Sequence, residues 1–106
     1  MVDYILVLTT VPDKTTGQEI SRVLIEERLA ACVTISGASE STYWWKDEIT
    51  QDEEFILFIK TKSSLYTALE EKIKELHPYD VPEIIALPLL KGHKKYLDWL
   101  EKETKT

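Results

Sequence analysis

The chain has few of the residues from which metal and redox sites are built. Only one of its 106 residues is cysteine, Cys32, and only two are histidine, His77 and His93. A lone thiol cannot form an internal disulfide, and these spacings match no zinc template, so a closed structural zinc site within one chain is excluded. Cys32 falls in an alternating apolar and polar segment, where a free cysteine is usually a small buried hydrophobe.

Glycine and long apolar runs are also scarce. With only Gly17, Gly37 and Gly92, the chain has no Gly-rich loop to cradle phosphates, which excludes the common nucleotide-binding motifs. No stretch approaches the roughly 20 apolar residues of a membrane-spanning helix. The first residues lack the basic region and cleavage pattern of a signal peptide. We therefore expect no membrane partner and a cytoplasmic location.

Basic residues are fewer than acidic ones, and asparagine is absent. The chain carries 19 Asp and Glu against 13 Lys and Arg, for a net charge of −6. Because no cluster of Lys and Arg reverses this charge locally, we expect no nucleic-acid partner. The lack of Asn beside abundant Glu and Lys matches chains selected for hot environments, so the composition predicts a thermostable protein.

Apolar periodicity predicts alternating strands and helices. Strands are expected at Tyr4 to Thr10, Ala31 to Trp45 with a kink near Gly37, Phe55 to Ile59, and Glu83 to Leu90. Helices are expected at Thr16 to about Leu29, at Leu65 to Leu76, and around Tyr96 to Leu100.

Local signals predict where these elements begin and end. Thr16 and Glu19 have the spacing of a capping box at the start of the first helix. The polar residues from Lys46 to Glu54 predict a turn between two strands. Pro88 offers no donor to a sheet ladder, which favours an edge position or a bulge for the last strand.

The order β-α-β-β-α-β-α indicates an α+β fold, with the ferredoxin-like split β-α-β-β-α-β arrangement and an added C-terminal helix. We expect one domain over residues 1–106. Right-handed crossovers would place both main helices on one face of the sheet. Three of the strands are nevertheless apolar on both faces, so the uncovered face predicts association with other subunits.

The segment from His77 to Glu83 is the strongest candidate for function. Its prolines, Pro78 and Pro82, hold it extended, so that His77, Tyr79 and Glu83 project from a stiff frame. The His77 imidazole is suited to ligating a metal or exchanging a proton near neutral pH. A histidine at a helix C-terminus is also favoured by the helix dipole alone, so both interpretations stay open.

Two further positions are candidates. Trp44 and Trp45 are adjacent on a strand and point to opposite faces, so if one lies in the core, the other belongs to an interface or a ligand pocket. Lys60 continues an apolar strand, where its ammonium would pair with a carboxylate such as Glu83 or Glu48.

Four segments together resemble the CutA family: Thr10 to Asp13, Arg28 to Val33, Tyr43 to Lys46, and Leu76 to Ile85. The closing Tyr96 to Leu100 is also similar, so the resemblance spans nearly the whole chain. It implies a ferredoxin-like protomer in a homotrimer, cytoplasmic in bacteria and associated with tolerance to divalent cations, including copper. It also implies an architecture similar to the trimeric PII signalling proteins, which is an analogy of fold alone.

The resemblance also implies site residues. His77 matches the family histidine associated with metal binding, and Cys32 matches the family cysteine after the first helix. Some members carry a thiol where this chain has Thr9 and a second histidine where it has Leu76, so a copper site built from those groups is incomplete here. Candidates for a cleft between subunits are Cys32, Trp45, Lys60 and Tyr79, with Glu83 beside them.

Three functions follow from these residues. The first is non-enzymatic binding of copper or another divalent cation, with His77, Asp80 and Glu83 as ligands and no metal needed for folding. The second is a PII-like regulatory module that binds a small ligand or a partner protein in clefts between subunits. The third is an enzyme in which His77 acts as acid or base with Glu83 or Tyr79. We expect the first, and no catalysis.

Overall fold

Residues 2–106, which the structure describes, form antiparallel strands, three α-helices and a short 3₁₀ helix at Ser63–Leu65. The strands and α-helices of this computed structural model are β1 (Tyr4–Val11), α1 (Lys14–Glu26), β2 (Cys32–Ile35), β3 (Ser39–Trp45), β4 (Glu48–Lys62), α2 (Tyr66–Leu76), β5 (Ile84–Pro88) and α3 (Lys94–Glu103). The strand order is β2-β4-β1-β5, and β3 pairs with the first half of β4. The mixed α+β fold expected from the sequence is confirmed, and β5 lies at an edge as Pro88 predicted.

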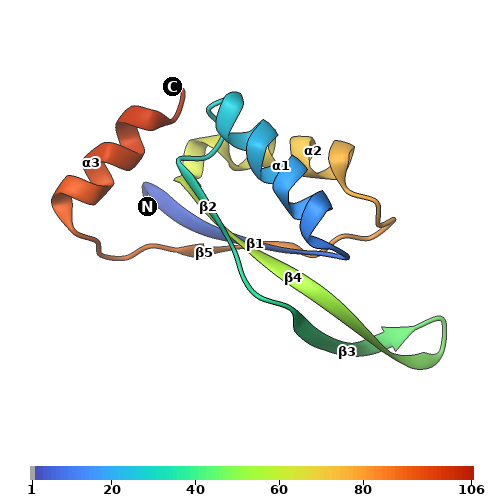
Figure 1. Ribbon diagram of the computed structural model, residues 1–106. Helices are drawn as coiled ribbons and strands as arrows, with labels where there is room; N and C mark the ends of the chain where they lie inside the picture. The colour runs from blue at the N-terminus through green and yellow to red at the C-terminus, as the bar shows by residue number, and fades with distance from the viewer. Residues whose placement is uncertain (1) are drawn as a thin grey trace.

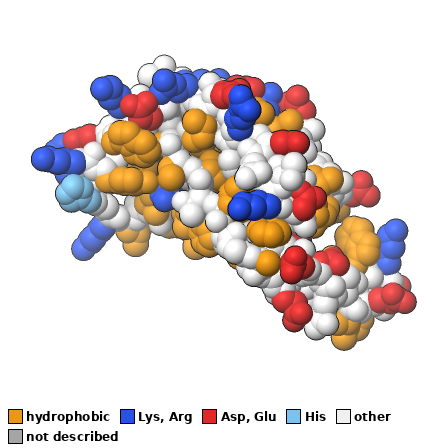
Figure 2. Space-filling view, viewed as in Figure 1, with side chains coloured by type: hydrophobic (Ala, Val, Ile, Leu, Met, Phe, Trp, Pro, Cys, Tyr) orange, Lys and Arg blue, Asp and Glu red, His pale blue; other side chains and the backbone are white. Residues whose placement is uncertain are grey.

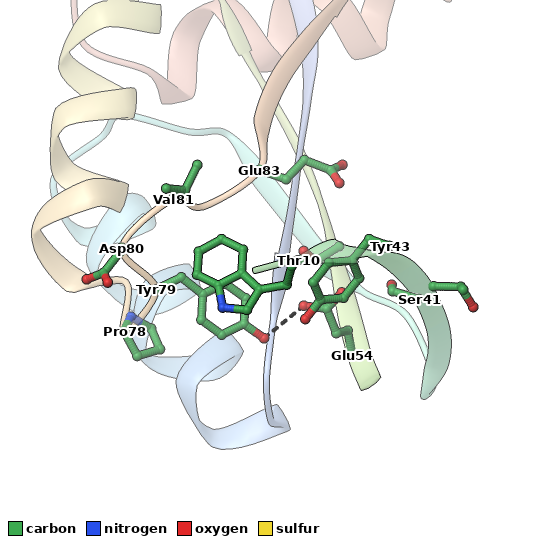
Figure 3. Close-up of a pocket in the computed structure, with 11 residues that line it drawn as sticks. Thr10, Ser41, Tyr43, Glu54, Pro78, Tyr79, Asp80, Val81 and Glu83 are labelled. Carbon is green, nitrogen blue, oxygen red and sulfur yellow. Dashed lines mark hydrogen bonds between the residues drawn. The ribbon is translucent and has the colours of Figure 1, made fainter. Parts of the chain in front are cut away.

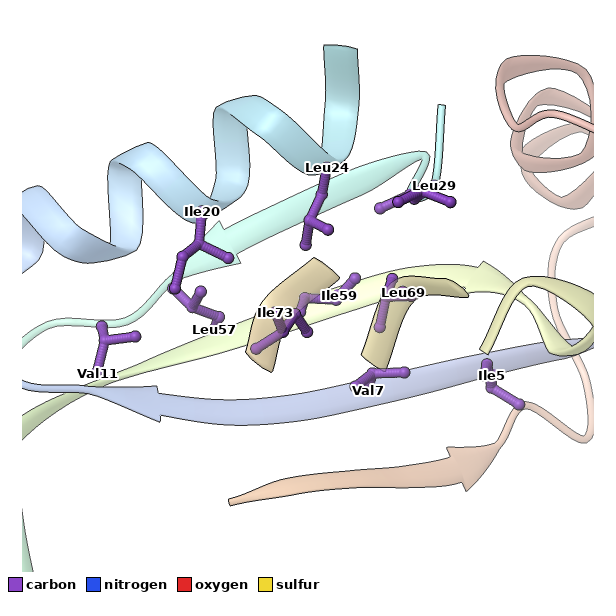
Figure 4. Close-up of a cluster of buried hydrophobic side chains, with 11 residues drawn as sticks. Ile5, Val7, Val11, Ile20, Leu24, Leu29, Leu57, Ile59, Leu69 and Ile73 are labelled. Atoms are coloured by element: carbon purple, nitrogen blue, oxygen red, sulfur yellow. The ribbon is translucent and has the colours of Figure 1, made fainter. Parts of the chain in front are cut away.

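The core lies between the sheet and the pair α1 and α2, which cover the same face (Figure 1). Alternate residues of β1 and β4 point into it, so that Val7 lies opposite Ile59 in the register of the two strands. Ile20 and Leu24 of α1 and Leu69 and Ile73 of α2 close over them, fully buried (Figure 4). The apolar stripes of the two helices therefore bury this face of β1 and of the half of β4 paired with it, whereas Ala86 of the edge strand stays exposed.

Helix α1 begins and ends earlier than the sequence suggested. Its N-cap is Asp13, whose carboxylate accepts the backbone N–H of Thr16 at 2.7 Å, and this hydrogen bond lowers the Asp13 pKa. The capping box on Thr16 is therefore wrong, because the acidic side chain three residues earlier takes the backbone donor. The helix ends at Glu26 because Arg28 adopts a left-handed backbone with φ of 60°.

The polar stretch from Lys46 to Glu54, expected as a turn, is mostly strand. The turn is only Lys46 and Asp47, whose φ values of 50° and 66° fit the primed turns that join two-stranded hairpins. The remaining polar residues belong to β4, and their backbones pair with β3. Most of their side chains are exposed, but Glu54 at the base of the hairpin is buried. The β3–β4 hairpin consequently extends beyond the body of the molecule (Figures 1 and 2). With the hairpin included, the molecule measures 45 Å along its longest axis.

The sheet face opposite α1 and α2, called the open face below, is only partly covered. Helix α3 lies at one end of it, where Glu101 binds the Lys62 ammonium at 3.0 Å and accepts the Tyr4 hydroxyl at 2.8 Å. Beyond this helix, Ile85 and Leu87 of the edge strand remain 49% and 44% exposed. The sheet is therefore apolar on both faces, as predicted. No helix within residues 2–106 has the length and apolar character to cross a membrane.

Candidate functional site

A pocket of about 650 Å³ lies where the hairpin meets the loop from residue 77 to 83. Its walls come from the end of β1, from β3 and β4, and from this loop (Figure 3). Four residues proposed from the sequence line it, namely Trp45, Tyr79, Asp80 and Glu83. The structure thus brings together residues that are up to 38 positions apart in the chain, on an open end of the molecule.

His77 is buried behind the pocket instead of lining it. One ring nitrogen, Nδ1, accepts the backbone N–H of Tyr79 at 3.2 Å, so Nε2 carries the proton and donates to the Thr10 carbonyl at 2.8 Å. The ring also packs on the Tyr79 ring with centroids 4.7 Å apart. Both nitrogens are engaged, so His77 fastens the loop to β1.

Tyr79 and Glu54 form the inner wall of the pocket. The Tyr79 hydroxyl donates to Glu54 Oε2 at 2.8 Å (Figure 3). Burial raises the pKa of Tyr79, and the hydrogen bond to Glu54 raises it further, so the phenol stays protonated at neutral pH. Sequence reasoning missed Glu54 by placing it in a turn. Glu54 lies two residues before Ile56 and four before Phe58, and residues spaced by two along a strand face the same side of the sheet. This spacing was the signal that could have found it.

The two adjacent tryptophans point to opposite sides of the hairpin, as expected. Trp45 lines the pocket and is 43% exposed, whereas Trp44 is 70% exposed on the other side. Neither lies in the core, because the hairpin extends past the helices that would cover it. Tyr43 joins Trp45 in the pocket, and its hydroxyl donates to Asp52, which raises the Tyr43 pKa. Tyr43 was not singled out from the sequence.

Cys32 and Lys60 lie elsewhere. They face each other across β2 and β4, on the open face and toward the end that α3 covers. The Lys60 ammonium lies 5.9 Å from the centroid of the Tyr96 ring. Within residues 2–106 Lys60 forms no ion pair, so the expected pairing with Glu83 or Glu48 is wrong; its ammonium lies beside an aromatic ring of α3 instead.

The proposed metal ligands do not form a metal centre within one chain. Among residues 2–106, no three His, Cys, Asp or Glu side chains are placed to hold a metal ion together. Asp80 and Glu83 are exposed at the pocket, while the nitrogens of His77 are already hydrogen-bonded. A cation held here would need ligands beyond those three residues of a single chain.

Comparison with known sequences and structures agrees with this fold. The Thermus thermophilus relative, "Divalent-cation tolerance protein CutA", is 46% identical over 99 residues, covering 93% of this chain and 96% of its own. A rice relative, "Protein CutA 1, chloroplastic", is 48% identical over 104 residues, and the chain spans 59% of its length. The predicted cytoplasmic location therefore stays a prediction.

Solved structures superimpose closely on this one. The T. thermophilus divalent cation tolerance protein has a TM-score of 0.94 at 45% identity, over 96% of this chain and 99% of that one. CutA1 from Oryza sativa has a TM-score of 0.95 at 48% identity, over 98% and 95% of the two chains. Residues 5–103 match the family described as "CutA1 divalent ion tolerance protein". The chain therefore belongs to the CutA1 divalent ion tolerance family.

Proposed function

We propose that this protein binds divalent cations, copper among them, as a cytoplasmic homotrimer and without catalysis. The observation that carries this proposal is the charge of the pocket, which is lined by Glu54, Asp80 and Glu83 and by no Lys or Arg side chain. Carboxylate oxygens attract and ligate divalent cations. The relatives from Thermus thermophilus and Pyrococcus horikoshii are named divalent-cation tolerance proteins, which supports the same assignment.

In this proposal Asp80 and Glu83 contact the cation, and His77 holds the loop that carries them. Both carboxylates are exposed and lie within six residues of the His77 anchor. Because one chain supplies no three-ligand group within residues 2–106, water or neighbouring subunits complete the coordination. His77 was expected to ligate the metal, but in this proposal it supports the loop instead, because both of its ring nitrogens are hydrogen-bonded.

Copper titration tests these roles. The double variant Asp80→Asn, Glu83→Gln is expected to weaken cupric ion binding at least about tenfold, because two anionic ligands become neutral. Isothermal titration calorimetry of the wild-type and variant proteins would measure the change. The matched control is Asp47→Asn, Glu53→Gln, which neutralises two exposed hairpin carboxylates outside the pocket lining. Equal binding by all three proteins would refute the assignment.

The trimer proposal is supported by the open face and by the hairpin, which extends the sheet beyond the body of the molecule. We also infer the ferredoxin-like topology, since the strand order β2-β4-β1-β5 follows from two crossovers through α1 and α2. Half-exposed apolar side chains such as Ile85 and Leu87 are typical of a surface that a second copy covers.

Light scattering on a sizing column should give a mass of about three times the 12.3 kDa of the chain. Ile85→Lys places a charge on the half-exposed edge strand and should lower this mass, while Ile85→Val should leave it unchanged. A wild-type mass of one chain would contradict the trimer.

We further propose that the protein is thermostable and folds without metal. Thermal unfolding followed by circular dichroism should give a midpoint above the mesophile range of about 45 to 65 °C. Because the buried contacts are apolar, excess EDTA should leave the midpoint unchanged. A fall of several degrees on chelation would show that a metal contributes to folding.

A PII-like regulatory role is the second candidate, favoured by the size of the pocket. At about 650 Å³ it falls within the range of small-molecule sites and is far larger than a metal ion. Lys60, a cleft candidate from the sequence and the one among them that could pair with an anion, lies outside the lining. The regulatory ligand of this alternative would therefore be neutral or cationic.

A further inference from the structure

Glu54 is a buried carboxylate without a cationic partner. Its side chain belongs to a residue that is only 6% exposed, and it lines the pocket. One oxygen accepts the Tyr79 hydroxyl, and within residues 2–106 no Lys or Arg forms an ion pair with it. Within the same residues, the other Glu54 oxygen is left free at the pocket, so the inner wall offers a negatively charged hydrogen-bond acceptor with no positive side chain beside it. A ligand with a positively charged hydrogen-bond donor would complement this group.

The rest of the lining identifies which kind of cation fits. Tyr43, Trp45 and Tyr79 present aromatic rings, which attract ammonium groups through their faces but do not ligate metal ions. Trp45 already accepts one such contact, since the Lys46 ammonium lies 6.0 Å from its ring centroid. A volume of about 650 Å³ also leaves room for an aliphatic chain along the rings.

We propose that this pocket binds an aliphatic primary amine. Its ammonium donates a hydrogen bond to the Glu54 oxygen that Tyr79 does not use, and its chain packs on Trp45 and Tyr43. Asp80 and Glu83 add negative charge at the exposed side, so a diamine binds more tightly than a monoamine. This proposal goes beyond divalent cation binding, because its main contacts are Glu54 and the rings.

Calorimetric titration of the full chain with butylamine at neutral pH tests the proposal. Wild type should bind, and 1,4-diaminobutane should bind about threefold to fivefold more tightly than butylamine. The neutral 1-butanol should not bind measurably, because it lacks the charge that Glu54 requires.

Variants separate the contacts. Glu54→Gln keeps an acceptor for Tyr79 but removes the charge, and should weaken butylamine binding at least about tenfold. Trp45→Leu should weaken it about threefold or more, whereas the matched control Trp44→Leu, on the opposite side of the hairpin, should not. Circular dichroism melts confirm that each variant is folded.

Three outcomes would overturn the amine site. These are the absence of butylamine binding by wild type, equal binding by wild type and Glu54→Gln, and equal losses from the two tryptophan variants. If wild type does not bind butylamine and Glu54→Gln also lowers the mass measured by light scattering, the cation that faces Glu54 would be a lysine of another subunit. Copper binding is a separate readout: the Asp80→Asn, Glu83→Gln variant should bind copper more weakly and still bind butylamine.

Discussion

Truncation of Ile59 to alanine is expected to lower the free energy of unfolding by about 2 to 5 kcal/mol. Ile59 has no exposed surface, and it lies opposite Val7 on β1 and Val33 on β2. Removing its buried methyl groups leaves a cavity between the sheet and both covering helices (Figure 4). Chemical denaturation at one fixed protein concentration would measure the loss.

Ile49 provides the matched control for this truncation. It is an isoleucine on the same strand but is 65% exposed on the hairpin. Ile49→Ala should change the free energy of unfolding by no more than about 0.5 kcal/mol. A loss below about 1 kcal/mol for Ile59→Ala would contradict the central position of Ile59 in the core.

Replacement of His77 by phenylalanine is expected to lower the free energy of unfolding by about 2 to 4 kcal/mol. Phenylalanine keeps a planar ring against Tyr79 but removes both nitrogens. The Thr10 carbonyl and the Tyr79 N–H would then lose their partners in a largely buried place. The loop would also detach from β1, so copper and butylamine binding should weaken together.

His93→Phe is the control, since His93 is exposed at the start of α3 and forms no capping hydrogen bond through its side chain. It should leave both stability and binding unchanged. Loss of copper binding by His77→Phe with unchanged stability and unchanged butylamine binding would instead show that His77 is a metal ligand. The two readouts therefore separate a supporting role from a ligating one.

The secondary structure was largely predictable because local periodicity follows burial. The strand predicted from the nearly continuous apolar run of Tyr4 to Thr10 and the helix predicted from the stripe of Leu65 to Leu76 end within about a residue of β1 and α2. The pairing of two strands across a turn was predicted, but the first half of β4 was missed. It is polar, and its strand conformation depends on pairing with β3 and not on a pattern of its own.

The candidate site was predictable only in part. The rigid loop of Tyr79, Asp80 and Glu83 was visible because two prolines frame it. Glu54 and Tyr43 were not, since each reaches the pocket through the register of the hairpin. His77 was singled out as a metal ligand, which stays a prediction, but its hydrogen bond to the Thr10 carbonyl, 67 residues away, could not be read from the sequence.

By itself, the amino-acid sequence determined the fold class and the family. It also determined that the sheet is apolar on both faces, although the two main helices cover only one. These properties follow from short-range patterns, which record what each strand and helix must bury. Only the tertiary structure decided that His77 supports the loop and that a buried Glu54 faces aromatic rings. Both depend on contacts between segments that are far apart in the sequence. Those contacts are set by the register in which the strands pair and by which polar groups then lie near a buried side chain.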